Sequence, residues 1–304
     1  MIFIIMNHRI LVRQIMTEMV NEVESKKYGL KYYAFDWDDN LMKMPTEIIL
    51  LDENGDEVGM STEDFAEYRT EIGKTPFKYN GSTIVGFAET PFRYFSTLGD
   101  QKFMKDIETA PLVREPWSDF VEAINNGSIF SIITARGHHP NTLKKGVYKL
   151  IMMGRGGLNR SKLVESLKEY RRKMGLKFID DENSLIKDYL DRCRFYPVSY
   201  GAGSATNPEE GKIRAMEEFI SYVKKLSLRL QKKEYQFVND VSNNFVPFTP
   251  MVGFSDDDIR NIESMKKHFE KKDDNILRTY HTKGDEKNIY EQLVKRMISK
   301  IKSK

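Results

Sequence analysis

At 304 residues, with 40% apolar and 31% charged residues, the chain has the composition of a soluble globular protein that can bury one sizeable core and carry a smaller second unit. Its formal net charge of +3 and its sequence pI of about 8.6 are too low to indicate nucleic-acid binding by themselves. The single cysteine, Cys193, excludes an intramolecular disulfide and fits a reducing compartment. A Cys/His zinc site is not indicated, because the five histidines show no ligand spacing.

Residues 1–6 are apolar, but this run is far too short for a signal peptide or a membrane span, and charged residues follow at once. We expect residues 1–30 to form an amphipathic helical arm. One side of that helix carries Ile10, Leu11, Ile15, Met16, Met19 and Val20. These features predict a cytoplasmic protein, or one in the equivalent compartment of a host cell, that has no membrane partner.

Short apolar runs that end at acidic or hydroxyl residues recur along the chain, which is typical of buried parallel strands. The run at 31–35 stops at Asp36, and the run at 128–133 is followed by Thr134. Because helical stretches alternate with these runs, we predict an α/β fold with a parallel sheet and helices on both faces. In such sheets, ligands bind beyond the carboxyl ends of the strands. The other predicted strands are 195–200, 250–254 and 276–280.

Residues 42–112 interrupt this alternation directly after the first strand. They contain a hairpin signal at the turn Asn54-Gly55, and then a helix that begins at the cap Ser61 or Thr62. Aromatic residues are dense in this stretch, and aromatics at such density usually form the core of a small unit. We therefore expect a small, separate α+β domain here.

A second interruption, residues 142–193, is predicted to be a mostly helical insertion in the main domain, which comprises residues 31–41 and 113–304. One of its helices is very basic, with Leu163, Leu167 and Tyr170 on its apolar face. A last helix is predicted after the fifth strand. Its apolar stripe carries Ile289, Leu293, Met297 and Ile301.

The residues at the strand ends have the chemistry needed for phosphoryl transfer. Asp36 and Asp38 are two residues apart beyond a strand, so one can attack phosphorus while the other handles the proton of the leaving group. The phosphoryl charge also has to be neutralised, and Mg²⁺, hydroxyl groups and ammonium groups are suited to that task. Thr134, Lys212 and the acidic tract 256–258 supply such groups later in the chain.

Four short motifs therefore follow one another at predicted strand and helix ends. They are an apolar strand before Asp-x-Asp-x-Asn-Leu, a strand ending in threonine, a lysine opening a helix, and a strand ending in an acidic pair. They occupy residues 32–41, 130–134, 208–212 and 253–257. In these motifs and in their order, the chain resembles the haloacid dehalogenase (HAD) superfamily of phosphohydrolases. The resemblance implies a Rossmann-like sheet, and it places residues 42–112 where that family carries its first type of cap.

The resemblance also implies a role for each motif residue. Asp36 would be the nucleophile that forms an aspartyl-phosphate, and Asp38 would protonate the leaving oxygen and then activate water. Lys212 would neutralise the phosphoryl group and orient Asp36. Lys144 and Lys145 also follow the second motif, so the choice of lysine stays open.

For the substrate, the resemblance implies that Thr134 hydrogen-bonds the phosphoryl oxygens, together with the neighbouring Ala135 and Arg136. From the residues alone, Arg136 is equally well explained as an exposed loop arginine. His138 and His139 are predicted to lie at the surface, although either one could face the site.

The metal implied by the resemblance is Mg²⁺, held by the Asp36 carboxylate, the main-chain carbonyl of Asp38 and an acid of the fourth motif. Asp256 is favoured as that acid and Asp257 comes next, with the register of the aspartate tract left open. Asn261 stands where family members with a double-aspartate motif often carry asparagine, which supports this register.

These observations predict a Mg²⁺-dependent phosphatase that cleaves a small phosphomonoester. A first alternative keeps the chemistry but takes nucleotides or nucleic-acid ends as substrate, because residues 155–173 are basic and the insert is aromatic. A second alternative is a non-catalytic binding protein that retains the fold. The oligomeric state and the natural substrate are not determined by the sequence.

Overall fold

The computed structural model describes residues 28–201, 207–238, 249–272, 276–283 and 286–289. Its main feature is a six-stranded sheet with the order β10-β9-β8-β1-β6-β7, in which five strands run parallel and β10 is antiparallel to β9. The strands are β1 (Tyr28–Phe35), β6 (Phe130–Thr134), β7 (Arg194–Pro197), β8 (Thr249–Asp256), β9 (Leu277–Lys283) and β10 (Glu286–Ile289).

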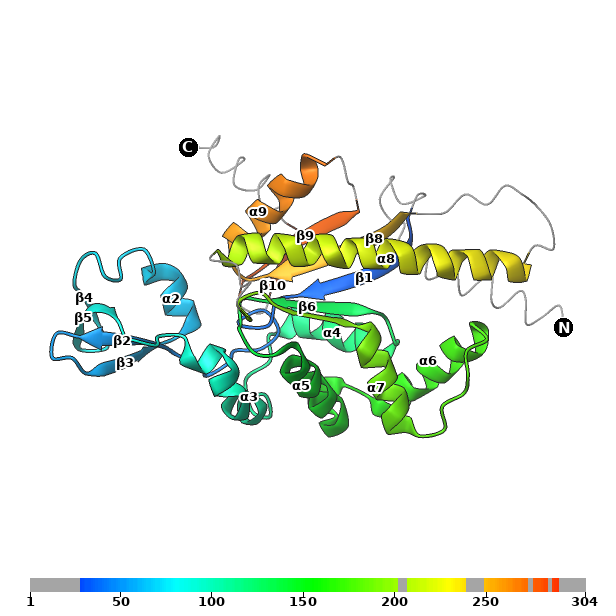
Figure 1. Cartoon of the computed structure of the whole chain (residues 1–304), viewed down its shortest axis with the longest axis horizontal. Coiled ribbons are helices and arrows are strands. Elements are labelled where there is room, and N and C mark those ends of the chain that lie inside the picture. Colours follow the sequence, from blue (N-terminus) through cyan, green and yellow to red (C-terminus); the bar gives the residue numbers. More distant parts are fainter. Residues whose placement is uncertain (1–27, 202–206, 239–248, 273–275, 284–285, 290–304) are drawn as a thin grey trace.

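Helices cover both faces of this sheet, as the alternation of side chains along β1 requires (Figure 1). Tyr32 and Ala34 point into the apolar core under α8 and α9, while Phe35 points into the core under the helices of the opposite face. The predicted α/β fold with a helix-flanked parallel sheet is therefore confirmed. The helices are α4 (Arg114–Asn125), α5 (Pro140–Met153), α6 (Arg160–Lys173), α7 (Glu182–Arg192), α8 (Pro208–Val238) and α9 (Ile259–Glu270).

The stretch after β1 folds into a four-stranded antiparallel sheet of order β3-β2-β5-β4 with one short helix, α2 (Thr62–Tyr68). Its hairpin turn lies at Gly55, whose φ of 85° suits glycine, and Ser61 caps α2 by accepting the N–H of Asp64. It has its own core around Leu50, into which the partly buried aromatics pack. The strands are β2 (Ile48–Asp52), β3 (Glu57–Met60), β4 (Phe77–Tyr79) and β5 (Ser82–Phe87).

The chain returns from the small sheet through three short helices, of which the last, α3, packs against the main core. Phe103 and Ile107 are fully buried in the same cluster as Trp37 and the residues of α4 and α5. The compact antiparallel unit is thus smaller than the predicted 42–112, because its last part completes the main core. The helices are η2 (Arg93–Phe95), η3 (Thr97–Gly99) and α3 (Asp100–Asp106).

The predicted helical insertion at 142–193 is helical, and α5, α6 and α7 form the connection between the parallel neighbours β6 and β7. A short η4 (Arg155–Gly157) joins α5 to α6. Leu163, Leu167 and Leu190 belong to the main core cluster, so these helices are one layer of the main domain and not a separate unit.

The ends of the chain differ from the predictions where the structure describes them. The first strand begins at Tyr28, so the predicted arm cannot extend to residue 30 as a helix, and residues 1–27 lie outside the described residues. Ile289 belongs to β10, and the rest of the predicted last helix also lies outside the described residues. Among the helices of the described segments, none has both the length and the apolarity that a membrane span requires.

Candidate functional site

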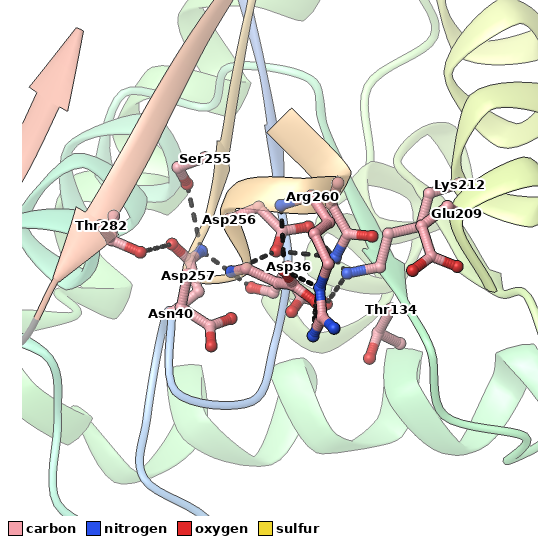
Figure 2. A network of polar contacts seen from close by, with 12 residues as sticks. Asp36, Asn40, Thr134, Glu209, Lys212, Ser255, Asp256, Asp257, Arg260 and Thr282 are labelled. Atoms are coloured by element: carbon pink, nitrogen blue, oxygen red, sulfur yellow. Dashed lines mark hydrogen bonds and ion pairs between the residues drawn. The ribbon is translucent and has the colours of Figure 1, made fainter. Parts of the chain in front are cut away.

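Residues from distant parts of the sequence meet at the carboxyl edge of the main sheet (Figure 2). Asp36 directly follows β1, while Thr134 and Asp256 are the last residues of β6 and β8. These three positions converge because β1 lies between β6 and β8 and runs parallel to both. The structure therefore brings together the strand-end residues of three of the predicted motifs.

Lys212, in the first turns of α8, reaches this edge and pairs with two carboxylates. Its Nζ lies 2.7 Å from Asp256 Oδ2 and 3.3 Å from Asp36 Oδ1, and its side chain is 2% exposed. Burial by itself lowers the pKa of Lys212, but Asp256 and Asp36 outweigh burial and hold that pKa above its ordinary value. Lys212 is therefore a permanent positive charge beside Asp36.

The other candidate lysines do not reach the site. Lys144 pairs with Asp191 at 2.6 Å, and Lys145 is exposed on α5. Among the three lysines considered, Lys212 is the one that the structure brings to Asp36.

Asp256 has partners at both of its oxygens. Oδ2 accepts from Lys212 Nζ, whereas Oδ1 accepts from Asn261 Nδ2 at 2.9 Å and from the backbone N–H of Asp258 at 3.0 Å. Asn261 is thus the residue that orients Asp256 at the start of α9, and Asp258 caps that helix. The carboxylate of Asp256 is a fixed element of the site, with three of its roughly four acceptor positions in use.

The carboxylate of Asp36 has fewer hydrogen-bond partners than that of Asp256. Its Oδ1 is buried and has no hydrogen-bond partner within the described segments, apart from the ion-pair distance to Lys212. Burial raises the pKa of Asp36 to about 8, with Asp256 and Asp38 adding to the rise and Lys212 opposing it. An oxygen in this position is available either to a cation or to an electrophile.

Asp257 completes a group of three acids. Carboxylate oxygens of Asp36, Asp256 and Asp257 lie within 4.8 Å of one another, the one such group found in the described part of the chain. Burial raises the pKa of Asp257 well above its usual range, and the neighbouring Asp256 and Asp36 raise it further. When all three acids are ionised, the single positive charge of Lys212 does not balance them, and a divalent cation would neutralise the remaining negative charge.

Hard oxygen ligands of this kind suit Mg²⁺, so the residues present fit the metal expected from the sequence. The sequence favoured Asp256 as the ligand from the fourth motif. The contacts favour Asp257, because Lys212, Asn261 and a backbone N–H already occupy Asp256. Asp36 and Asp257 are therefore the side chains best placed to hold a cation.

Added Mg²⁺ is expected to raise the melting temperature of the protein, because a cation that binds only the folded state stabilises it. At ten times the dissociation constant the gain is about 1.4 kcal/mol. Asp257→Asn should remove most of this shift, while Asp191→Asn, an exposed aspartate of α7, should leave it intact. Thermal unfolding with and without Mg²⁺ measures both effects. An equal shift in the wild type and in Asp257→Asn would contradict the assignment.

The loop that carries Asp36 is fixed by Asn40. The Asn40 Nδ2 donates to the main-chain oxygen of Asp36 at 3.0 Å and to Ser255 Oγ at 3.1 Å, and its Oδ1 accepts from Thr282 Oγ1 at 3.0 Å (Figure 2). This fully buried amide therefore joins the ends of β1, β8 and β9. Asp39 adopts a φ of 53°, the left-handed conformation that turns the chain sharply after Asp38.

Comparison of the chain with protein-family models, with curated proteins and with solved structures finds no match. No known activity of a relative can therefore be carried over to these residues. The chemistry available to the site follows from its charges, its hydrogen-bond donors and their positions.

Asp38, two residues after Asp36, pairs with Arg136. The Nε of Arg136 donates to Asp38 Oδ2 at 2.8 Å, and its Nη2 donates to Asp38 Oδ1 at 2.7 Å. Arg136 is 1% exposed, so its interpretation as an exposed loop arginine is wrong. Its predicted contact with substrate stays a prediction, and in this structure its donors are directed at protein groups.

His138 is also buried, contrary to the surface position predicted for it, whereas His139 is exposed as predicted. The ring of His138 lies 4.8 Å from that of Phe103, between centroids. Its Nε2 is 3.0 Å from Arg136 Nη1 and its Nδ1 is 2.7 Å from Asp100 Oδ1. Because arginine only donates, Nε2 accepts and Nδ1 carries the proton, so the ring is neutral in this arrangement.

Burial and the charge of Arg136 lower the pKa of His138 below its ordinary 6.5, although Asp100 and Asp38 oppose the shift. The unfolded chain therefore binds an extra proton first as the pH falls. The free energy of unfolding therefore keeps its full value above pH 6.5. It decreases as the pH falls from 6.5 toward the lowered pKa of folded His138, by up to about 1.4 kcal/mol per pH unit. His138→Gln should remove this component. Urea unfolding between pH 5 and pH 8 measures it, and identical slopes in both proteins would refute the prediction.

Thr134 and Ala135 lie at the end of β6, next to the acidic group. Thr134 is buried, and its Oγ1 accepts the backbone N–H of Arg136 at 3.3 Å, which leaves the hydroxyl proton free for another acceptor. Ala135 is exposed at the same edge. The positions of both residues agree with their predicted contact with phosphoryl oxygens, which stays a prediction.

The antiparallel unit contacts the site through α2. Thr62 Oγ1 donates to Asp39 Oδ2 at 2.5 Å, and Arg69, at the end of α2, pairs with Glu209 of α8 at 3.2 Å. Asp39 lies three positions after Asp36 in the sequence, and Glu209 lies three positions before Lys212. The unit is therefore placed to influence what reaches the carboxyl edge of the main sheet.

Proposed function

We propose that this protein is a Mg²⁺-dependent phosphohydrolase of the HAD type, with a Rossmann-like main domain and a cap formed by the antiparallel unit. The parallel sheet flanked by helices supports this proposal, as does the insertion of the cap directly after β1. The meeting of Asp36, Thr134, Lys212 and Asp256 at one sheet edge supports it further.

The observation that carries the proposal is the state of Asp36. It is a buried carboxylate with an unpartnered oxygen, fixed by its own backbone contacts and placed 3.3 Å from a permanently charged lysine. A structural aspartate at this depth would normally have both oxygens hydrogen-bonded, as Asp256 does. An unsatisfied, oriented carboxylate is suited to nucleophilic attack.

In the proposed reaction, an oxygen of Asp36 attacks the phosphorus of a phosphomonoester. The bond from phosphorus to the ester oxygen breaks, an aspartyl-phosphate forms, and the alcohol leaves after taking a proton. Water then attacks the phosphorus of the aspartyl-phosphate, which releases phosphate and restores Asp36. Lys212 neutralises the phosphoryl oxygens, and Thr134 donates a hydrogen bond to them. Asp38 is the proposed carrier of the proton in both steps.

Bound Mg²⁺ would neutralise charge on the phosphoryl group, which otherwise approaches three carboxylates. Asp36 and Asp257 would hold it, with the main-chain oxygen of Asp38 as the further ligand that the family resemblance implies. Without a cation, the ionised forms of these acids would repel a phosphate ester.

A small phosphomonoester is the favoured substrate. The basic helix α6 lies at the end of the main domain away from the cap (Figure 1), and several of its charges are already paired. Lys168 pairs with Glu182, and Arg171 pairs with Asp188. Among the aromatics of the cap, Tyr68 and Phe77 stack with ring centroids 5.1 Å apart and pack on its core. Phe87 and Phe92 are exposed but contact each other. Neither feature therefore favours nucleic acid.

The test is a phosphate-release assay on phosphorylated metabolites, an aryl phosphate and phosphorylated oligonucleotides, with Mg²⁺ and with chelator. We expect release that requires Mg²⁺ and prefers small esters with little dependence on salt. A preference for oligonucleotides that falls steeply with salt would favour the nucleic-acid alternative. No release from any substrate would favour a binding protein that keeps the fold.

A further inference from the structure

The contact between Arg136 and Asp38 is more elaborate than substrate binding requires. Both oxygens of Asp38 accept N–H groups of the same guanidinium, a two-point contact that fixes the carboxylate in position and in rotation. A lysine in place of Arg136 could fix neither the position nor the rotation of the Asp38 carboxylate. Asp38 has a half-buried side chain, yet its orientation is set by a fully buried partner.

The Arg136 guanidinium also has partners on the side away from Asp38. His138 Nε2 accepts from Nη1 of Arg136, Asp100 accepts from His138 Nδ1, and Thr142 Oγ1 donates to the other oxygen of Asp100 at 2.9 Å. This series of contacts, here called the Arg136 relay, runs from the turn after β1 to helices α3 and α5. Every polar side chain in the relay has a partner, and Arg136 and His138 are fully buried, which favours a rigid arrangement.

Both connections between the cap and the main domain contact Arg136. Thr46, just before β2, accepts from Nη2 at 2.8 Å. The guanidinium carbon also lies 4.9 Å from the ring centroid of Phe95 and 5.2 Å from that of Phe103, which both follow β5. The backbone N–H of Gly137 donates to the oxygen of Phe95 at 2.7 Å. Arg136 is therefore packed between the entry to the cap and the exit from it.

We propose that Arg136 is a positioning residue that, supported by His138 and Asp100, sets the orientation of Asp38 and ties it to the position of the cap. The proposal rests on the proposed phosphohydrolase function. It replaces the contact with substrate that the sequence suggested for Arg136. A shift of the cap connections moves Phe95, Thr46 or Asp100, and the guanidinium transmits that shift to Asp38. Misplacing a catalytic group by about 1 Å can cost about 10²-fold in rate.

The decisive experiment is a double-mutant cycle between Arg136→Lys and Asp38→Asn, assayed on an aryl phosphate. We expect Arg136→Lys alone to lower kcat by about 10- to 100-fold with KM changed less than about 3-fold. In the Asp38→Asn background, the same change should lower kcat less than about 3-fold, because the group that it positions is already disabled.

Two variants of His138 test the second half of the relay without touching Asp38. Glutamine can keep an acceptor near Arg136 but loses Asp100, whereas leucine loses both contacts. We expect kcat to fall by about 10-fold in His138→Leu and by about 3-fold in His138→Gln, with KM unchanged. The matched control is Arg171→Lys, since Arg171 is a buried arginine paired with Asp188 away from the site. It should lose stability but keep kcat.

The outcomes separate the two proposals. A wild type that releases no phosphate from any substrate would overturn both. A second outcome is an active wild type in which Arg136→Lys lowers kcat by the same factor in the Asp38→Asn background as it does alone. The arginine would then act independently of Asp38, and only the relay would be overturned. If Arg136→Lys fails to fold, wild-type kcat in His138→Leu would overturn the relay, and the graded losses expected for the two His138 variants would support it.

Discussion

Asp36→Asn is expected to abolish Mg²⁺-dependent phosphate release, with a loss of about 10⁴-fold or more in kcat. The carboxamide cannot form the aspartyl-phosphate, and removing a covalent nucleophile costs on this scale even when the rest of a site is intact. Single-turnover release of phosphate from an aryl phosphate is the measurement. Asp36→Ala should be equally inactive, and this variant excludes activity that is regained through deamidation of the asparagine.

The same substitution should stabilise the metal-free protein, by about 1 to 2 kcal/mol at pH 8 or above. The pKa of Asp36 is raised to about 8, so its ionised form destabilises the fold, increasingly as the pH rises from the ordinary value near 3.8. Asparagine removes that charge and leaves Lys212 paired with Asp256. A gain in stability together with loss of turnover is characteristic of a functional residue. Full activity, or a less stable variant, would contradict this account.

The sequence predicted which residues converge at the sheet edge where each of them follows an apolar strand. Asp36, Thr134 and Asp256 stand at the ends of runs that are buried on both faces, and such runs end where the chain meets a polar environment. The start of β1 was missed because Gly29 weakens the local strand signal. Pairing with β8 overrides that signal, through a register shift between Tyr28 and Lys31.

Side chains whose partners lie far away in the sequence were not predictable. A loop arginine followed by a glycine and two histidines is typical of a solvated segment. The burial of Arg136 and His138 depends on Asp38 and Asp100, which lie 98 and 38 residues away. The proposed preference for Asp257 over Asp256 as a metal ligand likewise depends on which carboxylate pairs with Lys212. These are properties of the assembled sheet edge, and no local pattern records them.

The limits of the antiparallel unit were also predicted too broadly, because its neighbours in space are distant in the sequence. The aromatic density of residues 42–112 suggested one continuous unit. In the structure Phe103 packs with Trp37, with ring centroids 5.4 Å apart, and contributes to the main core. Tyr68 and Phe77 instead stack within the antiparallel unit. Composition identifies an aromatic core but cannot assign each aromatic to one of two neighbouring cores.

Lys212→Met is expected to destabilise the protein by about 3 to 5 kcal/mol at pH 8 and to abolish turnover. Methionine fills a similar volume but leaves Asp36, Asp256 and Asp257 as a buried group of carboxylates with no cation, and removing one partner of a buried ion pair has this order of cost. Urea unfolding gives the stability. Added Mg²⁺ should recover part of the stability without recovering activity, because the metal neutralises the carboxylates but does not replace the ammonium donor.

A matched control distinguishes this effect from the loss of any lysine. Lys144→Met breaks the exposed pair with Asp191 and should cost less than about 1 kcal/mol with full activity. The double variant Lys212→Met/Asp256→Asn should be more stable than Lys212→Met, because the asparagine removes the carboxylate that lost its partner. Equal instability of the two would mean that Lys212 acts through packing alone. A more stable double variant that remains inactive would instead support a site in which one ammonium group both balances the buried charge and contacts the phosphoryl group.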